Sequence, residues 1–152
     1  MEKSWKKYAY LFTPLAVGGI VFPFIAKHID YTSLIKPPFA PPKVIFPIAW
    51  ALLYLLMGIS YKRLKSHEKF NLTLETVVYY GQLIINAFWP IIFFTLKWRY
   101  LACFWIVFLD CLITYMIVLF YKKDKNCAYL NIPYFIWSLF ATYLTIGIYT
   151  LN

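Results

Sequence analysis

The sequence predicts an all-α membrane protein whose five transmembrane helices form one bundle. Hydrophobic residues make up 62% of the 152 positions and charged residues only 14%, far from the composition of soluble domains. The apolar residues fall into five runs, each long enough to cross a hydrocarbon core of about 30 Å as a helix. Open strands are excluded because their backbone polar groups would find no partner in lipid. The connectors are too short for another domain, so we expect a single domain over residues 1–152.

The five predicted spans cover residues 8–26, 44–60, 77–96, 100–121 and 128–150. The first run follows a basic segment, Met1 to Lys7, which is also how a secretory signal begins. The run is too long for the apolar core of a typical signal, however, and it contains Pro14 and Pro23. We therefore expect it to be a retained first span.

Lysine and arginine are distributed unequally between the two sides of the predicted bundle. The N-terminal segment and the second and fourth connectors carry ten of them, and the first and third connectors carry five. The positive-inside rule then places the N-terminus inside, and the C-terminus and the first connector (residues 27–43) outside. The net charge of +9 does not indicate a nucleic-acid partner, because the basic residues flank apolar runs instead of gathering on one face.

Five of the nine prolines lie between Lys36 and Trp50, in the segment KPPFAPPKVIFPIAW. Proline fixes its own φ and restricts the residue before it, so the repeated Pro-Pro pairs exclude both a helix and an inner strand. We expect the first connector to be a stiff, extended loop. Trp50 lies one or two helical turns inside the span that follows. This combination predicts a lid over a pocket.

The third span carries amide and aromatic side chains at helical spacing, namely Tyr79, Gln82, Asn86, Trp89 and Phe93. Gln and Asn side chains that faced lipid would lose their hydrogen bonds, so we expect this stripe to face the bundle. On the fifth span, Trp137, Ala141 and Thr145 share a face. The small Ala141 could be a packing notch, but its position near Trp137 and the presence of a second Trp favour a cavity.

Asp110 is the only charged side chain within the five runs. A lone intramembrane carboxylate is a candidate functional group. The alternative is an acid, neutral or hydrogen-bonded, that ties two helices together, and the lack of Lys, Arg and His in the runs argues against a proton relay. The cysteines, Cys103, Cys111 and Cys127, have no metal-ligand spacing and no obvious disulfide partner, so we expect small buried hydrophobes and no metal site.

Ordered blocks in four parts of the chain resemble one known family. They are Lys36-Pro37-Pro38 with Pro41-Pro42, Phe46-Pro47 through Trp50 and Tyr54, Gln82-Leu83 with Asn86, Trp89 and Phe93-Phe94, and Pro133-Tyr134 with Trp137, Phe140-Ala141 and Leu144. They resemble the tryptophan-rich sensory protein/translocator protein family (TspO, the peripheral-type benzodiazepine receptor). The bacterial branch is the better match, because the chain is short and bare at its end.

The resemblance implies a five-helix protein of a bacterial cell membrane, often a homodimer, with a pocket under the first loop. It implies binding of porphyrins such as protoporphyrin IX and haem, and of isoquinoline-carboxamide-like molecules, with no required cofactor. By the block-by-block match, the ligand contacts would be Tyr31, Pro41, Trp50, Asn86, Phe93, Trp137 and Ala141.

The activity that the resemblance implies has two versions. Some bacterial members are similar to catalysts of light- and oxygen-dependent porphyrin degradation, in which case Trp50 and Trp137 would be the catalytic pair. The alternative is a transporter or regulatory sensor that binds porphyrin without changing it. Thr145 stands where the family usually has Asn, which would weaken a polar contact near the pocket. The end from Tyr149 to Asn152 lacks the basic residue of the animal cholesterol motif, so we expect no sterol binding by that motif.

Overall fold

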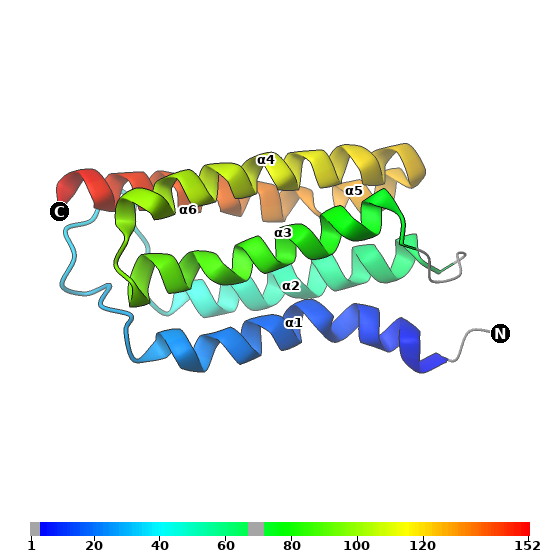
Figure 1. The fold of residues 1–152 in the computed structure, drawn as a ribbon, viewed down its shortest axis with the longest axis horizontal. Helices are drawn as coiled ribbons and strands as arrows, with labels where there is room; N and C mark the ends of the chain where they lie inside the picture. The colour runs from blue at the N-terminus through cyan, green and yellow to red at the C-terminus, as the bar shows by residue number, and fades with distance from the viewer. Residues whose placement is uncertain (1–3, 67–71) are drawn as a thin grey trace.

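The computed structural model describes residues 4–66 and 72–152, which form an elongated bundle of helices without a strand in either range (Figure 1). The elements are α1 (Ser4–Ala26), α2 (Ile45–Leu64), α3 (Leu74–Pro90), the π-helical turn η1 (Ile91–Thr95), α4 (Arg99–Lys123), α5 (Lys125–Tyr129) and α6 (Ile132–Leu151). Since η1 continues α3 and α5 leads into α6, five segments are long and apolar enough to cross a membrane. The predicted fold class is confirmed.

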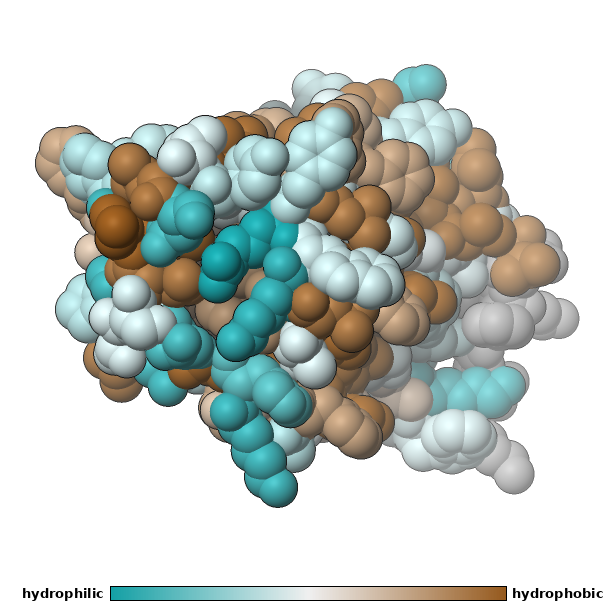
Figure 2. Space-filling model, turned by 60° about the vertical axis from the view of Figure 1, so that its left-hand side comes forward, coloured by the Kyte–Doolittle hydropathy of each residue, from teal (hydrophilic) through white to brown (hydrophobic). Residues whose placement is uncertain are grey.

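The helices lie side by side along one axis, and the described chain begins and ends at opposite ends of the bundle (Figure 1). Helix α1 packs mainly against α2, while α4 packs against both α3 and α6. Viewed toward the end that holds residues 27–43, hydrophilic side chains gather over this end and hydrophobic ones cover much of the flank (Figure 2). The inside–outside orientation rests on loop charges, two of which (Lys3 and Lys69) lie outside the described residues, and it stays a prediction, as does the homodimer.

The fifth span consists of two helices, whereas its continuous apolar run suggests one. The break falls at Leu130 and Asn131. Pro133 has no N–H to donate to the carbonyl four residues earlier, so an unbroken helix would lose a hydrogen bond there. The Asn131 Nδ2 donates instead to the Ser60 Oγ at 2.8 Å and to the Cys127 carbonyl at 2.9 Å, which ties the break to α2.

The third span changes its winding beyond Pro90. In η1 the Leu96 N–H donates to the Ile91 carbonyl at 2.9 Å, across five residues instead of four. Single π-helical turns of this kind are frequent at functional sites. Here the turn carries Phe93 and Phe94, which both border cavities.

Candidate ligand-binding cavity

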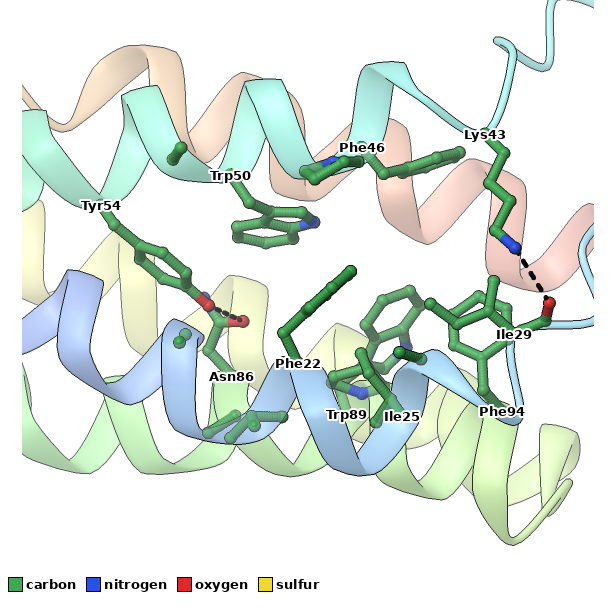
Figure 3. A pocket seen from close by; sticks show the side chains of 18 of the residues that line it. Phe22, Ile25, Ile29, Lys43, Phe46, Trp50, Tyr54, Asn86, Trp89 and Phe94 are labelled. Atoms are coloured by element: carbon green, nitrogen blue, oxygen red, sulfur yellow. Dashed lines mark hydrogen bonds between the residues drawn. The ribbon is translucent and has the colours of Figure 1, made fainter.

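A cavity of about 740 Å³ lies between α1, α2 and α3 beneath the loop of residues 27–43, which we call the first loop (Figure 3). We call it the main cavity. Its wall includes Gly18, Gly19, Phe22 and Ile25 from α1, Phe46, Pro47, Trp50 and Tyr54 from α2, Asn86 and Trp89 from α3, Phe94 from η1, and Ile29, Tyr31 and Lys43 from the first loop. Its volume lies within the range of about 300–1,000 Å³ that is usual for small-molecule sites. The wall is almost entirely apolar or aromatic.

Several residues that line the main cavity are also exposed. They are Gly19 and Phe22 on α1, Val44 just before α2, and Pro47 and Ala51 near the start of α2. The cavity is therefore not sealed from its surroundings along these two membrane spans.

At the far end from the first loop, polar side chains close the cavity. The Tyr54 hydroxyl donates to the Asn86 Oδ1 at 3.5 Å (Figure 3), and the Asn86 Nδ2 donates to the Tyr134 hydroxyl at 2.8 Å. The Tyr134 hydroxyl in turn donates to the Gln82 Oε1 at 2.7 Å. This network holds α2, α3 and α6 together and fixes Asn86 at the cavity end. All five residues of the predicted stripe on the third span are buried in the bundle, which confirms that prediction.

Trp50 projects from α2 into the main cavity (Figure 3). Its ring packs against Tyr54, with centroids 5.5 Å apart, and against Tyr134, at 6.2 Å. Both tyrosines belong to the polar network, so the position of the indole is set by side chains that are themselves held by hydrogen bonds.

The first loop contains neither helix nor strand, as its prolines predict, and it is held on the cavity side by its own hydrogen bonds. The Tyr31 hydroxyl donates to the Pro41 carbonyl at 2.9 Å, and Lys36 Nζ donates to the Tyr31 carbonyl at 3.0 Å. Lys43 Nζ donates to the Ile29 carbonyl at 3.4 Å, at the mouth of the cavity (Figure 3). A tyrosine hydroxyl is protonated at neutral pH, and burial raises the pKa of Tyr31 further above its ordinary value.

On its other side the first loop is attached to α6. The Asn152 side chain bonds both the N–H and the carbonyl of Ile35, at 3.0 and 2.8 Å. The Tyr143 hydroxyl donates to the Pro38 carbonyl at 2.8 Å. Pro37 packs closely on Gly147, because a Cβ added at position 147 would lie 2.6 Å from the Pro37 ring. The covering loop is thus an ordered part of the fold.

The seven residues that the resemblance suggested as ligand contacts do not all meet in one space. Tyr31, Trp50 and Asn86 line the main cavity. Phe93 and Ala141 line a second void of about 20 Å³, which we call the side cavity, and Tyr31 and Trp50 border it too. Pro41 takes part as the acceptor of the Tyr31 hydroxyl.

Trp137 lines neither cavity. Its ring packs against Phe46, at 6.0 Å between centroids, and against Phe140 at 5.6 Å, so Phe46 is the ring that faces the cavity. Sequence reasoning missed the whole α1 wall, including Gly18, Gly19 and Phe22. An apolar residue on an apolar span carries no signal that separates a cavity wall from a lipid-facing surface.

Asp110 lies apart from both cavities, where α4 meets α6. Its carboxylate accepts from the Ser138 Oγ at 2.5 Å and from the Thr142 Oγ1 at 2.6 Å. Of the two interpretations, this geometry supports the hydrogen-bonded tie between helices. Among the cysteines, Cys127 is buried, but Cys111 is exposed, which corrects the expectation that all three are buried: it lies on the outer face of α4. Within residues 4–66 and 72–152, no cluster of His, Cys, Asp or Glu could hold a metal ion.

Comparison with known proteins places the chain in a family. The TspO/MBR family matches residues 10–151. The tryptophan-rich protein TspO of Archaeoglobus fulgidus is 34% identical, with 97% of each chain covered. Protein CrtK of Rhodobacter capsulatus is 31% identical over 95% of this chain and 92% of its own, and the translocator protein of Bos taurus is 32% identical over 73% and 68%. The chain therefore belongs to the TspO/MBR family and is a multi-pass integral membrane protein.

Proposed function

We propose that the protein binds a tetrapyrrole, such as protoporphyrin IX or haem, in the main cavity. The observation that carries the proposal is a cavity of about 740 Å³ with aromatic walls and a single lysine, Lys43, at its mouth. A porphyrin is a flat apolar plate with an anionic edge. Aromatic side chains suit its faces, and a cation suits its edge.

The ammonium group of Lys43 can leave its present partner to bind the anionic edge of a porphyrin. Its ammonium group makes a hydrogen bond of 3.4 Å to the Ile29 carbonyl, at the long end of the range, and the residue is exposed. A carboxylate at the mouth would offer a shorter, charge-assisted partner. Isoquinoline-carboxamide-like molecules, which are also flat and apolar, would compete for the same space.

For turnover, the favoured residue is Trp50. Trp is the readiest electron donor in this wall, and Trp50 and Trp89 both border the two cavities. Of the two, Trp50 projects into the main cavity (Figure 3), whereas Trp89 is only 9% exposed and is held by Phe93 and Phe94. Light- and oxygen-dependent degradation would therefore depend first on Trp50, with Trp137 one ring further away behind Phe46. The exposed cavity-lining residues on α1 and α2, both membrane spans, favour the alternative, a carrier or sensor that exchanges unchanged porphyrin with the bilayer.

Titration of the purified protein with protoporphyrin IX, followed by absorbance in light and in darkness, tests both the binding of the porphyrin and its degradation. Binding should saturate, and Lys43→Gln should weaken it about tenfold. The control Lys97→Gln removes an equal charge from the same end of the bundle without touching the cavity, and should change nothing. Binding that does not saturate, or equal losses in both variants, would reject the site.

Trp50→Phe separates binding from turnover. The ring and most of the apolar contact remain, so affinity should fall about fivefold or less. Loss of porphyrin in light should slow strongly, because the indole that projects into the main cavity is gone and only that of Trp89 remains in its wall. If bleaching proceeds equally in wild type and variant, it does not involve Trp50, and binding without turnover becomes the function.

A further inference from the structure

The side cavity differs from the main cavity in its surroundings. None of the residues that line it is exposed, whereas the main cavity borders several exposed residues. Its wall is contributed by the first loop, α2, α3, η1 and α6. The side cavity therefore belongs to the interior of the bundle, and a molecule held there is in contact with protein side chains.

The wall of the side cavity is apolar. Its ten lining residues carry no charged or amide side chain and only two hydroxyl groups, those of Tyr31 and Thr145. Both hydroxyl protons are used within the protein, by the Pro41 carbonyl at 2.9 Å and the Ala141 carbonyl at 2.7 Å. The Nε1 atom of Trp89 is buried and has no open surface on either cavity. Since a buried water molecule makes about three hydrogen bonds, this void is a poor site for water.

The side cavity has the size of a very small molecule. A void needs about 10–15 Å³ to hold one water molecule, and this one has about 20 Å³. Rigid rings border it, because Phe93 stacks on Trp89 with centroids 5.5 Å apart and meets Phe94 edge-on at 4.8 Å. From α6, Ala141 contributes only a methyl group. Packed rings of this kind cannot bend into the gap, so the void persists.

We propose that the side cavity is a binding site for dioxygen. Dioxygen has two heavy atoms and no dipole, so it fits both the size and the polarity of this void. Its transfer from water into apolar surroundings is favourable, and small apolar cavities in proteins stay dry and take up apolar guests. The site is complete without a porphyrin in the main cavity.

The position of the side cavity gives the site a role. The two cavities share five aromatic residues, which are Tyr31, Phe46, Trp50, Trp89 and Phe94. Dioxygen in the side cavity is therefore held across a single aromatic wall from a ligand in the main cavity, and beside both of the wall's tryptophans. This role in turnover rests on the proposed porphyrin degradation, whereas the dioxygen site itself does not.

Paramagnetic relaxation of methyl groups by dioxygen tests the site in the protein without porphyrin. Methyl-labelled wild type in lipid nanodiscs is compared under nitrogen and under dioxygen pressure. The control is the methyl group of Ala102, which is buried at the same end of the bundle but lines neither cavity (Figure 1). Dioxygen should enhance relaxation at Ala141 by at least about threefold more than at Ala102. Equal enhancements, or Overhauser contacts between Ala141 and water, would overturn the site.

Ala141→Val distinguishes dioxygen in the side cavity from dioxygen dissolved elsewhere. The two added methyl groups fill the void, so the enhancement at Ile148, which lines it too, should fall to the level at Ala102. The control Ala51→Val adds the same groups to a residue that lines only the main cavity, and should leave the enhancement at Ile148 unchanged. An undiminished enhancement in Ala141→Val would overturn the site. If Ala141→Val does not fold, the comparison within wild type decides.

Light-driven loss of protoporphyrin IX tests the role of the site in turnover. With the porphyrin at saturation, Ala141→Val should slow the loss about threefold relative to wild type. The control Ala9→Val changes an exposed residue that lines neither cavity and should leave the rate unchanged. Equal rates in all three proteins would overturn the role in turnover. Wild type that neither binds nor bleaches the porphyrin would instead reject the proposed function, while the relaxation result, obtained without porphyrin, would still decide the dioxygen site.

Discussion

Helices α1, α2 and α3 run through both ends of the bundle, but they pack densely at one end and enclose a cavity at the other. At the end away from the first loop, Tyr61 and Tyr79 stack with ring centroids 3.9 Å apart, and Tyr10 meets Tyr61 edge-on at 5.3 Å. At the first-loop end, α1, α2 and α3 enclose the main cavity. The difference lies in side chains, not in helix number or length.

Glycines illustrate the contrast most directly. At Gly58 on α2, a Cβ would lie 2.0 Å from the Leu11 carbonyl oxygen, so the backbones of α1 and α2 nearly touch. At Gly19 on α1, a Cβ would meet nothing within 4 Å, and the residue borders the main cavity. One glycine permits close packing, and the other leaves space open. Stability should therefore depend on the first end and binding on the second.

Gly58→Ala should have the largest effect. The added methyl group forces α1 away from α2, and we expect the free energy of unfolding to fall by about 3 kcal/mol. Thermal unfolding in detergent measures the loss. Gly81→Ala is the matched control, because a Cβ there also meets nothing within 4 Å. Equal melting temperatures for the two variants would contradict the close contact.

Gly19→Leu should weaken ligand binding and leave the stability of the protein nearly unchanged. A side chain that grows into the cavity occupies ligand space without disturbing a packed neighbour, so we expect porphyrin binding to weaken by about tenfold or more. The melting temperature should stay close to that of wild type. Gly81→Leu, which adds the same side chain away from the cavity, should bind normally. Normal binding by Gly19→Leu would show that the ligand lies elsewhere.

Replacing Pro41 and Pro42 together by Gly tests whether the roof must be stiff. The Tyr31 bond to the backbone carbonyl at position 41 can persist, so the change acts on chain freedom alone. Ordering a looser loop costs binding free energy, and we expect about fivefold weaker porphyrin binding with an unchanged melting temperature. An unaltered affinity would reduce the first loop to a connector.

Removing the ion pair at the tightly packed end should change the stability of the protein least. The Arg63 Nε donates to the Asp124 Oδ2 at 2.7 Å, and this partner lowers the pKa of Asp124. A lowered pKa gives stability that is present above about pH 4, the unfolded value, and is lost as the pH falls through the folded value. Both groups are partly exposed, so the contribution is small.

Asp124→Asn isolates this charge, because Asn also caps a helix start and can replace the Asp124 bond to the Asn126 N–H. Its melting temperature should lie slightly below that of wild type at pH 6, and the difference should shrink as the pH falls through the lowered pKa of Asp124. A difference that does not change with pH would point to the cap instead of the charge.

Several features of this protein follow from its sequence by itself. Span number and helical class come from length and hydropathy, since lipid leaves the backbone no other way to satisfy its hydrogen bonds. The inward stripe from Tyr79 to Phe93 follows because amide groups cannot face acyl chains. The irregular first loop follows from its prolines. Each depends on local chemistry, which the order of residues contains.

Other features were decided by the tertiary structure. Phe22 and Gly19 became a cavity wall only through the placement of α1 beside α2, because apolar residues suit lipid and a cavity equally well. Phe46, and not Trp137, lines the main cavity, because the packing of α2 with α6 sets the Trp137 ring against the Phe46 ring, 6.0 Å between centroids. Trp89 became a buried donor without a partner because no neighbouring helix brought it an acceptor within the described residues. Such outcomes depend on which helices meet, and helical periodicity alone does not contain that information.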